Sequence, residues 1–206
     1  FWDNDMIKIF VLLVCCVALA WASEVNTKQI LRKGGRYYLR DDLAFFLLVA
    51  VLGIFTGLRN DYNDTWNYIK GFRTDGGLTE FFADPENLNP FKNPLFYFYQ
   101  SLLKEFTDEA QWMIFLSSVF TQYCFILFFK RYSRRFTFTV FLYFALGTFD
   151  VSLGAMKQTM AMAILTLSFP FLERGKLIRF YLVVLIAMMF HTYAICFAVL
   201  PLFARK

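Results

Sequence analysis

Lys157 is the only charged residue in an apolar stretch that runs from Ala155 to Leu172 and is long enough to cross a bilayer. A Lys near the centre of a membrane helix costs roughly 2.5–3.5 kcal/mol on insertion scales, and less near an interface. Membrane proteins tend to keep such a charge only where it faces water, a partner or a substrate. A cation in such a place suits an anionic group such as a phosphate. The alternative is a Lys whose aliphatic stem lets the ammonium reach a lipid head group.

A second group of polar residues follows an earlier apolar stretch. Arg59 comes first, and Asp61, Asp64 and Tyr68 follow within about two helical turns. Asp64 and Tyr68 are four residues apart, so they share one face of a helix. A guanidinium binds phosphate oxygens in pairs, and a carboxylate beside it can act as a general base. The structural alternatives are an interface anchor for Arg59, helix caps for the two Asp residues and an interfacial aromatic for Tyr68.

Three further polar residues accompany the later apolar stretches. Asp150 lies in a segment that we interpret as a turn, Gln158 follows Lys157, and His191 is the single histidine of the chain. The structural alternatives are a turn residue for Asp150 and a neutral, hydrogen-bonded core histidine for His191. The candidate bases are Asp61, Asp64 and His191, and the candidate substrate-binding residues are Arg59, Tyr68, Asp150, Lys157 and Gln158. The sequence does not rank the three bases.

The composition indicates a membrane protein. Hydrophobic residues make up 58% of the 206 residues, which is too high for a soluble domain of this length. The net charge of +5 would suggest nucleic acid in a soluble chain, but here the basic residues lie in short loops beside apolar stretches, so we expect no nucleic-acid partner. A single histidine argues against a histidine-based metal site. The four cysteines lie inside apolar stretches without CxxC spacing, so we expect buried thiols and no metal ligands or disulfides: Cys15, Cys16, Cys124 and Cys196.

The apolar stretches predict an all-α polytopic membrane protein with about six transmembrane helices, in a single integral membrane domain over residues 1–206. The expected spans are about 6–23, 42–58, 110–130, 136–151, 154–172 and 178–203. Between the second and third spans lies a long loop, 59–109, in which we expect short amphipathic helices rich in aromatic residues. Because Phe1 is not a start residue, we expect the chain to be part of a longer protein.

Loop charge predicts the sidedness. The loops at 24–41, 131–135 and 173–179 are rich in Lys and Arg, so the positive-inside rule places them in the cytoplasm. The long loop 59–109 and the short turn 150–154 are then external. The first span has an alternative as a cleaved signal peptide, but its basic cluster follows the apolar run, which favours a retained helix.

This topology gathers the unusual polar residues at one surface. Lys157 and Gln158 begin the fifth span just below the external side. His191 lies about thirteen residues into the sixth span, near the middle of the membrane or slightly external. Two cations, several carboxylates and an imidazole are therefore expected around one external cavity, which suits a phosphate-bearing ligand with a lipid anchor.

At these residues the chain resembles the EpsG family of bacterial surface-polysaccharide polymerases, which are relatives of the Wzy group. The resemblance covers most of the chain from about residue 42 to 203. Four segments carry it in order: Gly57–Tyr68 with its Arg, Asp and Tyr, the aromatic Asn93–Gln100, Gly154–Ala163 with Lys-Gln, and Phe190–Ala194 with Phe-His. The chain departs from the family pattern at Lys157, where Arg is common, and at Asn93, where an acid is frequent. Lys keeps the charge but loses the bidentate fork, and Asn93 cannot act as a base.

The resemblance implies an activity, a location and partners. A growing glycan would leave its polyprenyl-diphosphate carrier and join a hydroxyl group of the next lipid-linked repeat unit, giving an exopolysaccharide, a capsule or an O-antigen. The site would lie at the outer face of the bacterial cytoplasmic membrane in part of a GT-C-like fold. The reaction requires no cofactor, and the expected partners are polyprenyl-diphosphate-linked oligosaccharide, membrane lipids and other polysaccharide-assembly proteins.

Two other functions remain open. A flippase or exporter subunit for lipid-linked glycans would need the same cations and aromatic residues but no base. A membrane acyltransferase is disfavoured because the single histidine has no acidic or second histidine neighbour in the sequence.

Overall fold

The structure is a computed structural model that describes residues 2–26, 30–32, 36–38, 42–60 and 62–203. These residues form helices together with one small antiparallel hairpin, in which Leu31 pairs with Tyr37. In chain order the elements are α1 (Trp2–Asn26), β1 (Ile30–Arg32), β2 (Arg36–Tyr38), α2 (Leu43–Gly57), α3 (Thr65–Thr74), α4 (Gly77–Ala83), η1 (Pro85–Leu88), η2 (Pro90–Lys92), α5 (Pro94–Lys104), α6 (Ala110–Tyr132), α7 (Phe136–Ala145), α8 (Thr148–Gly154), α9 (Met156–Thr166), α10 (Phe169–Glu173), α11 (Leu177–Phe190), η3 (Thr192–Val199) and α12 (Leu200–Phe203). The prediction of a helical protein is confirmed.

Two helices are long and apolar enough to cross a membrane, namely Ile7–Asn26 within α1 and the whole of α6. A third candidate is the pair α7 and α8, which are bent by 60° at their junction. The apolar helices α2 and α11 have 15 and 14 residues, so each is roughly 21–22 Å long and shorter than a bilayer core of about 30 Å. The described residues therefore support two or three spans, and the prediction of about six is not confirmed.

The later predicted spans break at definite residues. The fourth breaks at Gly147, whose φ of 72° ends α7 and redirects the chain into α8. The segment expected to be a turn at 150–154 is consequently helical. The fifth breaks between Thr166 and Phe169, and Pro170 occupies the start of α10, where its missing N–H is tolerated.

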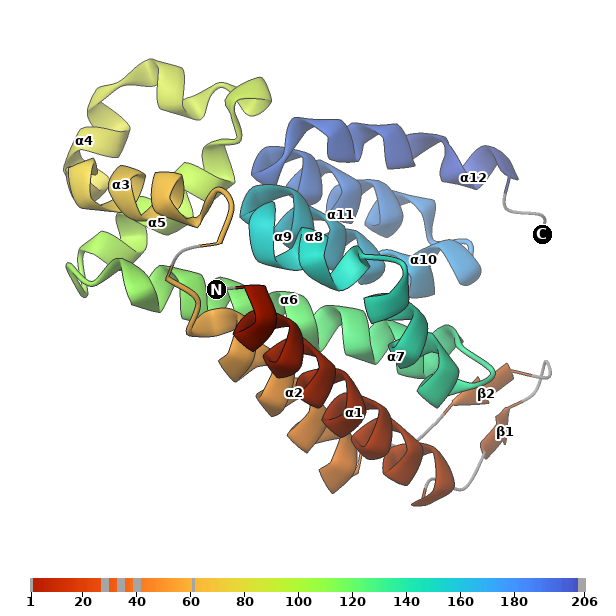
Figure 1. Cartoon of the computed structure of the whole chain (residues 1–206). Helices are drawn as coiled ribbons and strands as arrows, with labels where there is room; N and C mark the ends of the chain where they lie inside the picture. Colours follow the sequence, from red (N-terminus) through yellow and green to blue (C-terminus); the bar gives the residue numbers. More distant parts are fainter. Residues whose placement is uncertain (1, 27–29, 33–35, 39–41, 61, 204–206) are drawn as a thin grey trace.

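The sixth predicted span, 178–203, is two elements that lie side by side. Helix α11 ends at Phe190, and η3 packs back along it (Figure 1). The reversal occurs at His191, whose backbone is extended with φ −155° and ψ 118°. The prediction that His191 lies midway along one continuous span is therefore wrong.

Helices α2 and α6 form the most extensive contact between two elements of the described structure. Gly53 and Gly57 lie one turn apart on the face of α2 that meets α6. A Cβ atom on Gly53 would lie 3.0 Å from Val119, and one on Gly57 would lie 2.7 Å from the ring of Phe115. Small residues four apart allow two membrane helices to approach closely, and this pair does so here.

Several polar residues inside the bundle contact one another across helices. Gln122 of α6 donates to Ser152 of α8 at 3.0 Å and accepts from the Tyr143 hydroxyl of α7 at 3.1 Å. At the other end of α6, the buried Lys130 lies 3.7 Å from Asp42 and over the ring of Phe45. These contacts hold α7, α8 and α2 against α6, because buried polar groups are stable where they find polar partners.

The two ends of the molecule differ in character (Figure 1). The β1–β2 hairpin, the connection from α6 to α7 and the connection from α10 to α11 lie at one end, which we call the basic-loop end. Glu24 near the end of α1 accepts two hydrogen bonds from Thr137 there. Helices α3, α4 and α5, the start of α1 and the reversal at His191 lie at the opposite end. The candidate site residues belong to this second end.

Candidate functional site

Lys157 is held by two aromatic rings of α5. It is the second residue of α9 and is half-exposed. Its Nζ atom donates a hydrogen bond to the Tyr97 hydroxyl at 2.8 Å and lies 4.2 Å and 4.8 Å from the ring centroids of Tyr97 and Phe96. Aromatic faces attract a cation without neutralising its charge. Among the described residues, no carboxylate lies within ion-pair distance of Lys157, so its charge is available to an anionic ligand.

Arg59 is fixed at the end of α2. Its Nη1 donates to the Thr56 carbonyl at 2.6 Å and to Ser118 Oγ at 2.7 Å, and its Nε donates to Thr65 Oγ1 at 3.3 Å. Burial lowers the pKa of Arg59 to about 10, so the guanidinium stays charged at neutral pH. All three acceptors are uncharged, so these bonds orient the cation without neutralising it.

Arg59 also lines a pocket of about 330 Å³ that reaches the start of α1. Lys8 of α1 lines the same pocket, together with Asn60 and Tyr62. In the sequence Lys8 only flanks the first apolar stretch, so no local signal distinguishes it. Its position shows that α1 contributes a second cation beside Arg59.

Tyr68 of α3 packs against the Phe96 ring, over which the Lys157 ammonium also lies. Burial raises the pKa of Tyr68, the backbone N–H of Lys157 and the charge of Arg59 lower it, and Asp64 and Tyr97 raise it. Its ring lies edge-on against Phe96, 5.9 Å between centroids. The surroundings of this hydroxyl therefore include residues just after α2, just before α3, in α5 and in α9, and three other predicted site residues, Arg59, Asp64 and Lys157, lie around Tyr68.

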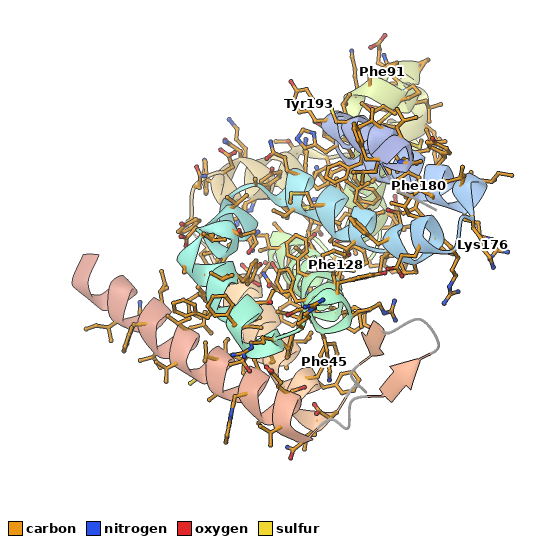
Figure 2. The ribbon with its side chains drawn as sticks, turned by 90° about the vertical axis from the view of Figure 1, so that its right-hand side faces the viewer. Phe45, Phe91, Phe128, Lys176, Phe180 and Tyr193 are labelled. Carbon is orange, nitrogen blue, oxygen red and sulfur yellow. The ribbon has the colours of Figure 1, made fainter. Side chains whose placement is uncertain are left out.

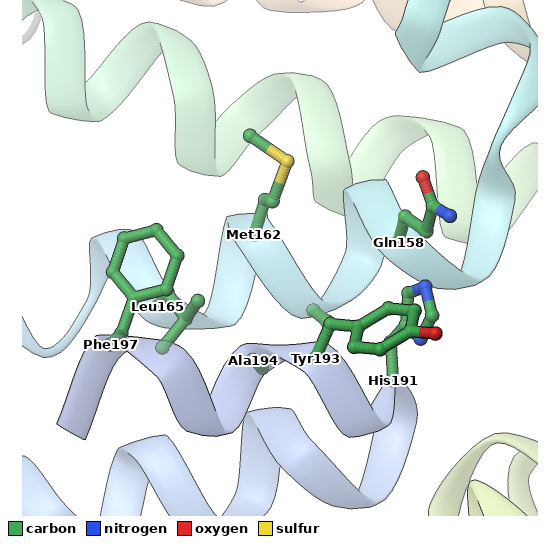
Figure 3. A pocket seen from close by; sticks show the side chains of 8 residues that line it. Gln158, Met162, Leu165, His191, Tyr193, Ala194 and Phe197 are labelled. Carbon is green, nitrogen blue, oxygen red and sulfur yellow. The ribbon is translucent and has the colours of Figure 1, made fainter.

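His191 lies at the chain reversal and lines a second pocket. This pocket has a volume of about 240 Å³ and also contains Gln158 and Tyr193 (Figure 3). Burial lowers the pKa of His191, and the positive charge of Lys157 lowers it further. No described residue hydrogen bonds to its buried Nδ1 atom. His191 is thus a titratable group beside a cation, although it is not placed where the sequence predicted.

The reversal brings His191 to the loop between α4 and α5. Thr192 Oγ1 donates to the Phe91 carbonyl at 2.9 Å. Figure 2 shows Phe91 and Tyr193 close together. The long loop 59–109 therefore covers the reversal and supplies one wall of the site.

The three predicted aspartates differ in their positions. Asp64 precedes α3 but makes no capping hydrogen bond, and its Oδ1 atom accepts only from Asn67 at 3.4 Å among the described contacts. Asp150 is exposed in the first turn of α8, where its charge acts on Tyr62 near the Arg59 pocket. The structure does not bring Asp150 to Lys157 and His191. Asp61 lies outside the described residues.

Tyr97 is the contact that sequence reasoning missed most clearly. It is 60 residues from Lys157, and the aromatic-rich segment around it gave no reason to select one ring.

Within the described ranges, no three His, Cys, Asp or Glu residues gather as metal ligands would.

Comparisons with known proteins place the chain in a family. Neither the curated proteins nor the solved structures contain a match, so the expected likeness to GT-C-like polymerases stays a prediction. The family model of EpsG matches residues 42–206, which include Arg59, Tyr68, Lys157 and His191. The chain therefore belongs to the EpsG family.

Proposed function

We propose that this protein joins lipid-linked oligosaccharide repeat units into a surface polysaccharide, such as an exopolysaccharide, a capsule or an O-antigen. Membership of the EpsG family indicates a polysaccharide polymerase-like role. The observation that carries the finer proposal is that α3 lies between the two cations: Arg59 donates to Thr65, and Tyr68, one turn later, packs against the Phe96 ring that Lys157 also contacts. Two cations at the same end of the molecule suit a diphosphate, whose charge is too large for a single cation to balance.

In the proposed reaction, a hydroxyl oxygen of the acceptor sugar attacks the anomeric carbon of the donor glycan. A new carbon–oxygen bond forms as the bond from the anomeric carbon to the diphosphate oxygen breaks, and the lipid diphosphate leaves with the electron pair. Lys157 and Arg59 stabilise the negative charge that develops on this leaving group. The proton of the hydroxyl passes to a base, for which the candidates remain Asp61, Asp64 and His191.

We propose the outer face of the bacterial cytoplasmic membrane as the site of the reaction. The support is that the connections rich in Lys and Arg lie at the end of the molecule opposite to α3–α5 and His191 (Figure 1). If the positive-inside rule applies, the basic-loop end faces the cytoplasm and the candidate site faces outward.

The test is reconstitution of the purified protein in vesicles with a polyprenyl-diphosphate-linked repeat unit. Gel analysis of the released glycan should show chains of increasing length for the natural protein. The Lys157→Met variant, inserted at an equal level, is the control and should release none. Movement of the lipid-linked unit across the vesicle membrane without chain growth would instead support a flippase or exporter subunit.

A further inference from the structure

Two adjoining pockets form one groove along α9. The first is the pocket of about 240 Å³ that contains His191 and Gln158, and the second has a volume of about 190 Å³. They share Met162, Leu165 and Phe197 in their walls, so they lie next to each other along α9. From Gln158 to Leu165 the helix rises by roughly 10 Å, and the second pocket continues beyond that point.

The polar groups of this groove lie at one end. Gln158, His191 and Tyr193 are at the end near Lys157, Met162 lies between, and Leu165 and Phe197 are at the far end (Figure 3). The second pocket is lined mainly by aromatic and aliphatic side chains of α6, α9, α10 and η3, together with Thr148 of α8. The hydroxyl of Thr166, which also lines this pocket, donates to the Ala163 carbonyl within its own helix. A charged head group would lose its hydration there without gaining a partner, whereas a hydrocarbon chain loses nothing.

The groove runs from the candidate-site end toward the basic-loop end. A lipid whose head group lies at the surface beside Lys157 sends its tail in this same direction, into the hydrocarbon region. The groove therefore fits the orientation of a lipid held by its anionic head at the site, and its two ends match the two parts of such a lipid.

We infer that this groove binds the isoprenoid chain of the polyprenyl-diphosphate carrier, with the diphosphate at Lys157. The inference rests on the proposed function and adds where the lipid part of the substrate lies. Met162 is the best position at which to test the groove, because it lines both pockets. Its side chain is 41% exposed, so a larger side chain there would close the groove without entering the buried core.

The experiment measures binding of undecaprenyl diphosphate and of dimethylallyl diphosphate to the purified protein in nanodiscs. The two probes share the diphosphate head and differ in chain length. Met162→Trp should weaken binding of undecaprenyl diphosphate on the order of tenfold or more and leave dimethylallyl diphosphate unchanged, since it removes tail contacts alone. Met162→Ala, which widens the groove, should keep the affinity of the natural protein. Lys157→Met should weaken binding of both probes.

The matched control is Leu116→Trp, because Leu116 of α6 is 42% exposed and lines neither pocket. It should bind both probes as the natural protein does. The melting temperature of each variant is measured beside its binding, so that a loss of binding is not mistaken for unfolding. Equal undecaprenyl diphosphate binding in Met162→Trp, or an equal loss in Leu116→Trp, would overturn the inference. Competition by phosphatidylglycerol as strong as that by unlabelled undecaprenyl diphosphate would also overturn it and would identify a general phospholipid groove.

The binding assay separates this inference from the proposed function. Selective tail binding without any chain growth would leave the groove assignment standing and remove the polymerase proposal. Normal chain growth in Met162→Trp with the long-chain substrate would support the polymerase proposal and remove the groove assignment.

Discussion

Asn93 accepts hydrogen bonds from both the backbone N–H and the hydroxyl of Thr192, at 3.1 Å and 3.3 Å. Asn93 has left-handed backbone angles, φ 57° and ψ 50°, and immediately precedes α5. It therefore joins the helix that carries Tyr97 to the residue that follows His191. The relative position of the Lys157 ammonium and the His191 imidazole depends on this contact, although Asn93 itself cannot act as a base.

We predict that Asn93→Gly lowers polymer formation about tenfold or more while the protein remains folded. Glycine accepts the left-handed backbone but removes the acceptor for Thr192, so the reversal at His191 shifts relative to α5. Asn93→Asp should retain most activity, because a carboxylate oxygen can accept the same bonds. Glycan length and melting temperature are measured together. Thr192→Val is the matched control, since its backbone N–H still donates to Asn93, and an unchanged product from Asn93→Gly would refute the positioning role.

We predict that Lys157→Met inserts normally and loses activity, whereas Lys157→Arg retains it. Lys157 lies at the start of α9 and, among the described residues, hydrogen bonds through its side chain to Tyr97, so expression should hold when it is replaced. Arg keeps the cation and can occupy the same aromatic faces of α5. Tyr97→Phe should keep the ring contact, lose one hydrogen bond worth about 1 kcal/mol and reduce activity several-fold. An active Lys157→Met variant would show that this residue only contacts lipid head groups.

We predict that Arg59→Ala abolishes polymer formation and that Arg59→Lys keeps part of it. The structure adds a stability effect, because hydrogen bonds from a charged donor contribute about 1.5–3 kcal/mol. Ser118→Ala separates the two effects: it removes one acceptor of the guanidinium but leaves its charge, so activity should stay near that of the natural protein. Chemical denaturation and glycan length are measured on all three variants. An equal loss of activity in Ser118→Ala would reduce Arg59 to a structural anchor.

Part of this site could be predicted from the sequence. Lys157 stands out because one charge interrupts an apolar stretch, and the helices α1, α2 and α6 follow from hydropathy and from Asp42, whose carboxylate caps α2 by accepting from the Phe45 N–H at 2.8 Å. These signals are local, so a single sequence contains them.

The reversal at His191 could not be predicted in the same way. The residues on both sides are apolar, and neither Gly nor Pro lies at the turn, so the hydropathy of 178–203 looks continuous. What ends α11 is a distant contact, since Asn93 supplies the acceptor for the first N–H after the turn. Gly147 and Pro170, by contrast, are local signals of the two earlier breaks, because Gly and Pro interrupt helices.

We predict that Gly57→Ala destabilises the protein by about 1–3 kcal/mol, because its Cβ atom would overlap the ring of Phe115 and lie 3.1 Å from the Phe115 Cα atom. Gly71→Ala is the control, since the nearest atom there is Gln100 Nε2 at 3.7 Å and alanine favours the helix. Unfolding in mixed detergent with increasing denaturing surfactant measures both. Equal stability of the two variants would mean that α2 and α6 can separate without cost.

The last prediction concerns sidedness, on which the external location of the site depends. On a background with Cys15, Cys16, Cys124 and Cys196 replaced by Ala, a cysteine at Leu88 should react with an impermeant maleimide added to intact cells. Leu88 is 54% exposed in the loop that covers the site.

A cysteine at Arg174, in the connection from α10 to α11, should react only after the cells are opened, because that connection belongs to the basic-loop end. Gly34, which lies outside the described residues, should behave as Arg174 does by the positive-inside rule. Both positions must label fully in permeabilised cells, which shows that the thiols are accessible. Labelling of Arg174→Cys from outside, with Leu88→Cys protected, would invert the topology and place the Arg59–Lys157 site in the cytoplasm, where a lipid-linked repeat unit awaiting polymerisation would not meet it.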